Sequence, residues 1–316
     1  MMRIHAVQTG TVRVHERQRS GRGSGLIRFA NTLLDREWTA PLPIYAWVVE
    51  HPEGLLVIDT GETARTARPG YFPRWHPYFR LAVREEVTAG QEIGPAMKTL
   101  GLSTSDVRWV VMTHLHTDHA GGLHHFPAAE ILVSATEYRL ARGTLGKLRG
   151  YLPQHWPAWF RPRLINVTAD ATGLDGGRPL TAVGDVRIVA TPGHTAGHVS
   201  VLVEEDRRAL LFAGDTSYTE ANLVSGIVDG VASLGGGQAA AARTLRQIRQ
   251  YASSTPTVYL PSHDPGAAER LTARREVVQF PRAGKNRIPQ MATMPACRGT
   301  LARTPDSRRS TCEREG

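Results

Sequence analysis

The residues with the clearest chemical potential lie in the segment of residues 113–122, which reads THLHTDHAGG. His114 and His116 alternate along an extended backbone, so their side chains would point to the same side. The turn that follows would bring Asp118 and His119 to an adjacent position. Neutral imidazole and carboxylate groups bind zinc, and also iron, cobalt or manganese. The spacing therefore predicts a metal site.

The elements that must position this site are strands. The apolar run Val107–Met112 directly precedes the cluster and is typical of a buried strand. Three further candidate ligands follow other strand-like runs, namely His194, Asp215 and His263. A single His or Asp after a strand more often caps it or forms a hydrogen bond. Three of them, together with the cluster, indicate one composite site.

The remaining pattern predicts one α+β domain. Apolar, β-branched runs predict strands at Ile4–Gln8, Val12–His15, Pro43–Glu50, Leu55–Asp59, Val107–Met112, Ile131–Ser134, Val186–Ala190, Val199–Glu204, Ala209–Ala213 and Thr257–Leu260. Helical spacing predicts helices at Ile93–Leu100, from about Ala120, at Thr136–Arg142 and at Gln238–Ala252. A basic Gly/Ser loop is expected at Arg17–Gly25, and residues 62–90 carry no clear pattern. Strands and helices recur in this order in both halves, which favours two sheets packed face to face with helices outside.

Composition excludes several classes of protein. Hydrophobic residues make up 41% and charged residues 21% of the 316 residues, as in ordinary globular proteins. No apolar run approaches the roughly 20 residues of a membrane-spanning helix. The start of the chain lacks the apolar stretch of a secretory signal, so a cytoplasmic protein is expected. The only cysteines are Cys297 and Cys312, far from the cluster, which argues against thiolate ligation and a disulfide framework.

The positive charge is concentrated at the end of the chain. The net charge is +9, and residues 282–316 contribute eight Lys or Arg residues against three Asp or Glu residues. This segment is rich in Arg, Pro, Thr and Ser and has no apolar periodicity, so we expect a disordered basic tail. The functional domain is then residues 1–281. Nucleic-acid binding through the tail is the competing interpretation, and it would weaken steeply with salt.

The order of motifs along the chain resembles a known family. HxHxDH, then Thr-Pro-Gly-His, Gly-Asp and Ser-His, resembles the metallo-β-lactamase superfamily over residues 1 to about 280. The resemblance implies a four-layer αββα sandwich with a metal site along one edge, between the two sheets. Carried over residue by residue, it assigns one metal to His114, His116 and His194, a second metal to Asp118, His119 and His263, and the bridging position to Asp215.

The expected cofactors are two divalent metal ions, with Zn²⁺ the expected identity. A water held between two such ions loses a proton near neutral pH, which would supply a hydroxide nucleophile. No serine or cysteine nucleophile is needed, and no motif for one is present. Asp59 resembles the aspartate with which this superfamily orients a ligand histidine.

The sequence after the expected bridging aspartate indicates one branch of the superfamily. In Asp215-Thr216-Ser217-Tyr218, a tyrosine three residues after the aspartate resembles the N-acyl-homoserine lactonase branch of the superfamily. In that branch Tyr218 would hydrogen-bond the carbonyl region of the lactone. Asp118 would carry a proton to the leaving alkoxide as the ring opens. The expected partner is a small-molecule lactone or ester, without nucleic acid or membrane, and a homodimer is left open.

Other residues receive more modest interpretations. Trp156, Trp159 and Phe160, together with residues 62–90, are candidates for an apolar groove that holds the acyl chain. His198 is expected to hydrogen-bond its neighbour His194 rather than to bind metal. His124 and His125 are expected at the surface.

Related activities remain open. A glyoxalase-II-like thioesterase would carry a basic and aromatic stretch after the last histidine, where this chain has Asp264–Ala268. β-Lactamases usually lack the bridging carboxylate, and diiron oxidoreductases tend to place Glu where His116 stands. A phosphotriesterase uses the same pair of metals. A tRNA-processing nuclease would explain the positive charge, but that charge lies in the tail rather than around the site.

Overall fold

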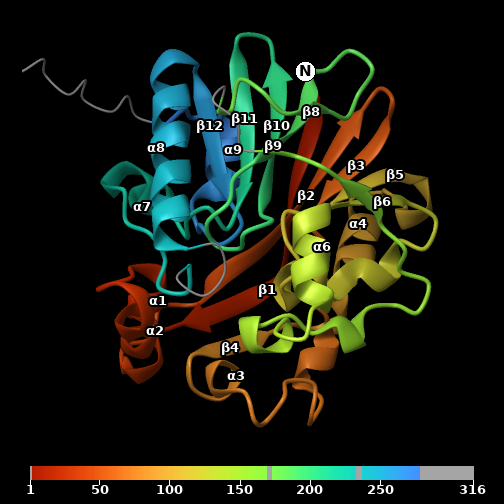
Figure 1. Ribbon diagram of the computed structural model, residues 1–316. Coiled ribbons are helices and arrows are strands. Elements are labelled where there is room, and N and C mark those ends of the chain that lie inside the picture. Colours follow the sequence, from red (N-terminus) through yellow and green to blue (C-terminus); the bar gives the residue numbers. More distant parts are fainter. Residues whose placement is uncertain (1, 169–172, 233–236, 278–316) are drawn as a thin grey trace, which may run out of the picture. The chain divides into compact units, whose positions relative to one another are not determined.

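Two β-sheets packed face to face form the centre of the structure, and helices cover both outer faces (Figure 1). The computed structural model describes residues 2–168, 173–232 and 237–277. The arrangement is a four-layer αββα sandwich, which confirms the predicted fold class. The segment 282–316, for which the sequence predicts a disordered tail, lies outside the described residues.

The first sheet has seven strands in the order β4-β1-β2-β3-β5-β6-β7. Their bounds are β1 Arg3–Val14, β2 Leu42–His51, β3 Gly54–Ile58, β4 Val83–Glu86, β5 Val107–Val111, β6 Glu130–Ser134 and β7 Arg163–Ile165. Strands β3, β5, β6 and β7 are parallel neighbours, so their carboxyl ends lie at one edge. The HxHxDH loop leaves the sheet at that edge, directly after β5.

The second sheet has five strands in the order β12-β11-β10-β9-β8. Their bounds are β8 Arg178–Pro179, β9 Val186–Ala190, β10 Val199–Glu205, β11 Arg208–Gly214 and β12 Thr257–Pro261. Strands β11 and β12 are parallel, so the residues after each of them emerge side by side. Asp215 follows β11 and His263 follows β12.

The alternation of side chains on β2 shows how the layers are packed. Trp47 and Val49 lie in the core between the sheets, and the Trp47 ring lies 5.4 Å from the ring of Phe212 on the opposite sheet. Ala46 and Val48 point the other way, into the core beneath the helices. Because a central strand buries both faces, it reads as a continuous apolar run.

Helices complete the two outer layers, as Figure 1 shows. The first sheet packs against α4 (Ile93–Thr99) and α6 (Ala135–Arg142) through the second core cluster. The second sheet packs against α8 (Gln238–Ser254), which buries Leu245 and Ile248 at helical spacing. The predictions for these three helices are confirmed to within two residues.

Short elements depart from prediction. The prediction of a loop at Arg17–Gly25 is wrong at its start, because α1 spans Glu16–Arg19. At the end of the predicted loop, α2 (Gly25–Leu34) begins. Residues 62–90 contain α3 (Pro77–Leu81) as well as β4. Helices of four or five residues are too short to show a hydrophobic period, so their existence depends on tertiary contacts.

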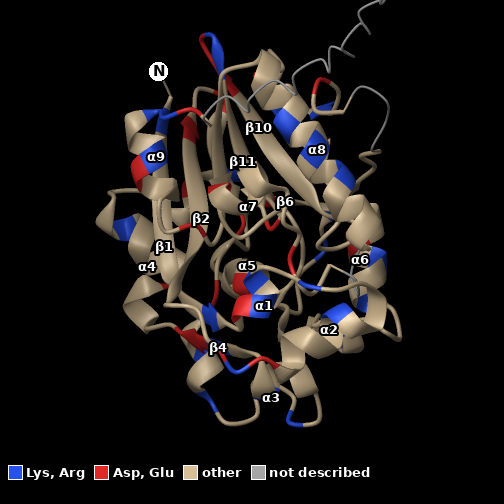
Figure 2. Ribbon diagram, turned by 90° about the vertical axis from the view of Figure 1, so that its left-hand side faces the viewer, with Lys and Arg blue, Asp and Glu red and all other residues tan. Residues whose placement is uncertain are grey.

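Charged residues are distributed over the outer helices. On the face shown in Figure 2, Lys and Arg residues lie on α6, α8 and α9 (Ala267–Ala273), interspersed with uncharged residues. Among the described residues, none of the helices has both the length and the apolar character needed to cross a membrane.

Candidate metal centre

The HxHxDH loop turns at once into a helix. His116 is the N-cap of α5, which spans Thr117–Ala120 and therefore begins earlier than the predicted start near Ala120. The extended segment before His116 carries His114, and the first turn of α5 carries Asp118 and His119. One short loop thus supplies four of the candidate ligands from two different backbone conformations.

The structure brings all seven predicted residues together around Asp215. The Nε2 atoms of His119 and His263 each lie 3.4 Å from Asp215 Oδ1, and His194 Nε2 lies 3.5 Å from Oδ2. Two groups flank this carboxylate. The first consists of His114, His116 and His194, and the second consists of Asp118, His119 and His263. This grouping is the one that the family resemblance assigns.

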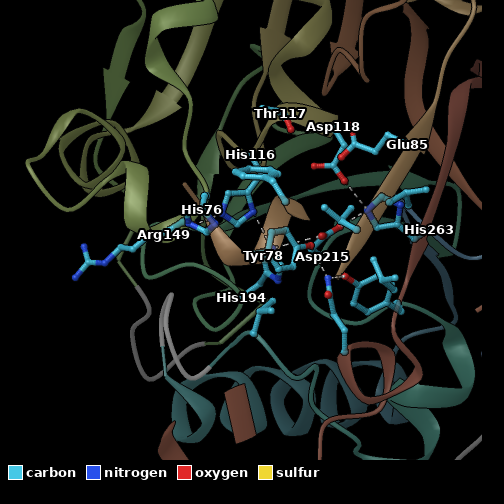
Figure 3. Close-up of a pocket in the computed structure, with 18 of the residues that line it drawn as sticks. His76, Tyr78, Glu85, His116, Thr117, Asp118, Arg149, His194, Asp215 and His263 are labelled. Carbon is cyan, nitrogen blue, oxygen red and sulfur yellow. Dashed lines mark hydrogen bonds and ion pairs between the residues drawn. The ribbon is translucent and has the colours of Figure 1, made fainter. Parts of the chain in front are cut away.

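Contacts within each group are equally close. His116 Nδ1 lies 3.0 Å from His194 Nε2, and His263 Nε2 lies 3.3 Å from Asp118 Oδ2. The ligand atoms of each group lie within 4.8 Å of one another. Figure 3 shows His116, Asp118, His194, Asp215 and His263 arranged around one cavity.

Buried atoms without partners test whether a metal fits. His114 Nε2, His119 Nε2 and Asp215 Oδ1 are buried and accept or donate no hydrogen bond among the described residues. Leaving a buried polar group unpaired costs about 1–3 kcal/mol. These atoms all face the centre of the cluster, where cations would satisfy them. The donor set of imidazoles and carboxylates therefore fits a pair of divalent metal ions.

Protonation within the cluster is consistent with this fit. Burial lowers the pKa of His116 to about 4, with the neighbouring His194 adding to the effect. Burial likewise lowers the pKa of His114. Burial opposes the charged form of His263 too, but Asp215 and Asp118 raise its pKa to about 10. Histidines bind metal in the neutral form, so metal binding would release a proton from His263.

Asp59 holds His119 in place. Its Oδ2 lies 2.8 Å from His119 Nδ1, and its two oxygens accept hydrogen bonds from the backbone and hydroxyl of Thr113. The predicted hydrogen bond between Asp59 and a histidine of the cluster is therefore confirmed. Asp59 has a φ of 57°, which is unusual for a residue other than glycine.

The other histidines are oriented by backbone carbonyls. His263 Nδ1 lies 2.9 Å from the carbonyl oxygen of Pro43, and His116 Nε2 lies 3.1 Å from that of Arg149. Each carbonyl holds one ring nitrogen in place. The other nitrogen, Nε2 of His263 or Nδ1 of His116, is then directed at the cluster.

His198 supports Asp215 and not His194, which corrects the prediction. Its Nε2 accepts a hydrogen bond of 3.0 Å from the backbone N–H of Asp215, and its Nδ1 lies 2.9 Å from Thr191 Oγ1. Burial lowers the pKa of His198 to about 3, so the ring is neutral and can accept this bond.

Gly214 gives a first test of this packing. It has a φ of 52°, and a Cβ added there would lie 2.6 Å from His198 Nε2. We expect Gly214→Ala to lower the free energy of unfolding by about 1–3 kcal/mol beyond its backbone strain, and to reduce metal content, because His198 and with it Asp215 must move. Urea denaturation measures the change.

Gly184 provides the matched control for Gly214. Its φ is 78°, but a Cβ added there would meet nothing within 4 Å. Gly184→Ala should therefore cost only the backbone strain of about 1–2 kcal/mol and leave metal content unchanged. Equal losses of stability and metal in both variants would contradict the packing role of Gly214.

Glu137 is a supporting residue that the sequence did not reveal. It is fully buried on α6, and its carboxylate accepts hydrogen bonds from Leu115 N (3.1 Å) and Thr195 Oγ1 (2.7 Å). Glu137 therefore ties the HxHxDH loop to the loop that carries His194. Within its helix it reads as an ordinary surface glutamate, so no local signal could have identified it.

His124 and His125 are partly buried, in contrast to their predicted surface position. Both lie on a 3₁₀ turn after α5, with their Nε2 atoms 3.2 and 2.8 Å from Glu92 Oε2. Glu92 also accepts a hydrogen bond from Ala64 N. This contact joins the start of α4 to the turn that follows the metal loop.

A cavity opens beside the cluster. It measures about 730 Å³, counting space open to solvent, and is bordered by Asp118, Asp215 and Tyr218. Its apolar lining residues are Val12, Val14, Phe29, Phe79, Val83, Leu148 and Val231. Phe79 and Val83 come from residues 62–90, which confirms that segment as a source of the wall.

The aromatic residues predicted for the groove lie elsewhere. Phe160 is buried in the core beneath α6, and Trp156 packs on it with ring centroids 5.2 Å apart. Trp159 is 39% exposed, and none of these three residues lines the cavity beside the cluster. The prediction for Trp156, Trp159 and Phe160 is therefore wrong. Trp156 and Phe160 anchor the proline-rich loop to the core here.

Known proteins resemble this chain in sequence and in fold. Residues 39–274 match the family described as the metallo-beta-lactamase superfamily. A "probable metallo-hydrolase" of Mycobacterium tuberculosis is 35% identical over 184 residues, which cover 56% of this chain and 57% of the relative, so the match spans little more than half of that relative. The N-acyl homoserine lactonase AttM of Rhizobium radiobacter is 26% identical over 290 residues, covering 84% of this chain and 94% of AttM.

A solved structure agrees with the sandwich. A mutant of AiiA from B. thuringiensis, crystallised with N-decanoyl-L-homoserine at its active site, superimposes with a TM-score of 0.67 at 20% identity. The superposition covers 85% of this chain and 95% of AiiA. At this identity the likeness establishes the fold alone. Because the family pattern extends over most of the chain, from residue 39 to residue 274, this protein belongs to the metallo-beta-lactamase superfamily.

Proposed function

We propose that this protein is a dinuclear metal-dependent lactonase that opens the ring of N-acyl-homoserine lactones. The observation that carries the proposal is the position of Tyr218. Its phenol lies in the same cavity as Asp118 and Asp215, and its ring stacks on His263 with centroids 5.5 Å apart. The lactonase AttM, which aligns over most of both chains, supports the same activity.

The residues present would hold two divalent ions, for which zinc suits the mixed imidazole and carboxylate donors. Such ions, when bound, polarise an ester carbonyl and make a water molecule acidic near neutral pH. The remaining requirements fall on the side chains of this protein, which must bind the substrate, orient it and move a proton.

In this proposal Tyr218 donates a hydrogen bond to the substrate. Its side chain is 5% exposed, and burial raises its pKa well above the ordinary value, so the phenol keeps its proton. A neutral O–H donor stabilises the charge that develops on the carbonyl oxygen of an ester under attack.

In this proposal Asp118 transfers the proton. Its side chain is 17% exposed, whereas that of His119 is fully buried, so Asp118 is open to the cavity. Burial would raise the pKa of Asp118, but His119 and His263 lower it to about 2. An ionised carboxylate can take the proton released by the attacking water and deliver it to the ring oxygen as the bond to the carbonyl carbon breaks.

In this proposal the acyl chain of the substrate lies in the same cavity. The cavity is lined both by the apolar side chains listed above and by the polar cluster. Such a lining suits a molecule that joins a polar ring to a hydrocarbon chain.

Loss of the phenol hydroxyl tests the role of Tyr218. We expect Tyr218→Phe to lower kcat for an acyl-homoserine lactone about 10-fold, the contribution of one hydrogen bond near its upper range. Metal content should be unchanged, because the phenol is not among the candidate ligands. Steady-state kinetics and metal analysis measure both quantities. Turnover at the parental rate would contradict the donor role.

A substrate panel tests the function itself. The metal-loaded protein should hydrolyse N-acyl-homoserine lactones faster than aliphatic lactones, aryl esters, phosphotriesters or a glutathione thioester. Mass spectrometry should identify the ring-opened N-acyl homoserine as the product. A protein that cleaved phosphotriesters or thioesters efficiently and left these lactones intact would have a different function.

A further inference from the structure

A buried glutamine joins two tyrosines at the wall of the cavity. The Gln18 side chain is 1% exposed, and its Nε2 donates hydrogen bonds of 2.7 Å to Tyr78 Oη and of 2.7 Å to Tyr218 Oη. All three side chains line the cavity beside the metal cluster. They come from α1, α3 and the loop after β11, so the contact is entirely tertiary.

The backbone around Gln18 fixes this bridge. Gln18 N donates to the carbonyl oxygen of His15 over 2.8 Å, and Gln18 O accepts from Gly230 N over 2.7 Å. The backbone of Gln18 is therefore held in place beneath the two phenols. Tyr218 is held from the other side by its stacking on His263.

Counting donors and acceptors shows what this trio offers. A carboxamide nitrogen carries two hydrogens, and here each contacts one phenol oxygen. Each phenol then keeps its own O–H to donate. A phenol has an ordinary pKa of about 10, so both are protonated near neutral pH. Gln18 Oε1 is buried and has no hydrogen-bond partner among the described residues.

The trio thus presents two O–H donors next to the metal cluster. An acyl-homoserine lactone carries two carbonyl oxygens, one in the ring and one in the acyl amide. A simple aliphatic lactone carries only the ring carbonyl. The two O–H donors therefore match the two carbonyl oxygens of the amide-bearing molecule.

We propose that Tyr78 and Gln18 form a subsite for the acyl amide of the substrate. Tyr78 Oη donates to the amide carbonyl, Gln18 holds Tyr78 Oη in place through its Nε2, and Tyr218 remains the donor to the ring carbonyl. Gln18 also sets the spacing of the two phenols. The proposal rests on the lactonase function, and it makes the preference for amide-bearing lactones a property of these two residues.

The test compares two substrates in one variant. For Tyr78→Phe, we expect kcat/KM for N-hexanoyl-homoserine lactone to fall about 10-fold, chiefly through KM. For γ-decanolactone, which lacks the amide, kcat/KM should stay within about 2-fold, because the hydroxyl has no partner there. Equal losses on both substrates, or no loss on either, would overturn the subsite.

A matched control and a second variant sharpen the result. Tyr138 stacks on Trp156, away from the cavity, so Tyr138→Phe makes the same chemical change and should leave both rates unchanged. Gln18→Met keeps length but removes both polar atoms, and it should reduce the preference for the amide substrate as Tyr78→Phe does. A Gln18→Met protein with the parental preference would contradict the bridge.

Direct binding separates this proposal from the function on which it rests. Calorimetry with ring-opened N-hexanoyl homoserine, which retains the amide, should show about 10-fold weaker binding to Tyr78→Phe than to the wild type. If the wild type opens no lactone, the proposed function is wrong. If it opens lactones but Tyr78→Phe binds this product unchanged, only the subsite is wrong.

Discussion

Replacing Asp215 by asparagine is expected to remove both metals and to lower kcat/KM by about 10³-fold or more, a larger loss than removal of one transition-state donor. Asp215 lies at the centre of the cluster, where each of its oxygens faces histidines of a different group. Burial opposes its ionisation, but His263 and His119 hold its pKa well below the ordinary value. Asparagine keeps the shape but loses the negative charge that both metals would share.

The measurement is metal analysis of the purified Asp215→Asn protein, followed by kinetics after addition of zinc. The matched control is Asp185→Asn, because Asp185 bonds His51 and Thr181 outside the cluster. That variant should retain metal and activity. Wild-type protein stripped by a chelator should resemble Asp215→Asn, and full recovery by Asp215→Asn on zinc addition would contradict the bridging role.

Local patterns were sufficient to predict the candidate ligands. Strands have a strict geometry, so a residue directly after a strand is placed at a sheet edge, and parallel pairing puts several such residues side by side. Asp215 after β11 and His263 after β12 illustrate this, since the two strands are parallel neighbours. Because those strands were recognisable as apolar runs, the cluster and the sandwich could both be predicted.

Residues that support the cluster escaped prediction because they act at long range. Gln18 lies 200 positions from Tyr218 along the chain and sits on a helix of four residues. Glu137 occupies an ordinary helical position, yet it bonds loops near Leu115 and Thr195. Neither position has a local signature, since only the folded chain decides which polar groups meet.

The prediction for the aromatic segment was wrong for a related reason. Trp156 and Phe160 were expected to line a groove, but both pack beneath α6. Large apolar side chains in an irregular loop are stabilised equally by a pocket wall or by a core, and composition does not distinguish the two. The wall comes instead from residues such as Val12 and Phe79, which reach the cavity from β1 and α3.

Asp59 has a positive φ and also bonds His119 and Thr113 through its carboxylate. Substitutions at this position distinguish the effect of the backbone conformation from that of the carboxylate. We expect Asp59→Ala to weaken metal binding about 10–100-fold, because His119 loses the partner that orients it. The free energy of unfolding should fall by about 3 kcal/mol, since buried groups of His119 and Thr113 lose an acceptor. Metal titration against a competing chelator and urea denaturation measure these changes.

Glycine at position 59 distinguishes the orientation of His119 by the carboxylate from strain in the backbone. Asp59 has a φ of 57°, which glycine adopts freely, so Asp59→Gly should be about 1 kcal/mol more stable than Asp59→Ala. It should nevertheless bind metal as weakly, because the carboxylate is absent from both. Asp206 has a φ of 55° and is exposed, so Asp206→Gly and Asp206→Ala should show the same difference in stability with metal binding intact. Parental metal affinity in Asp59→Gly would show that the backbone, and not the carboxylate, positions His119.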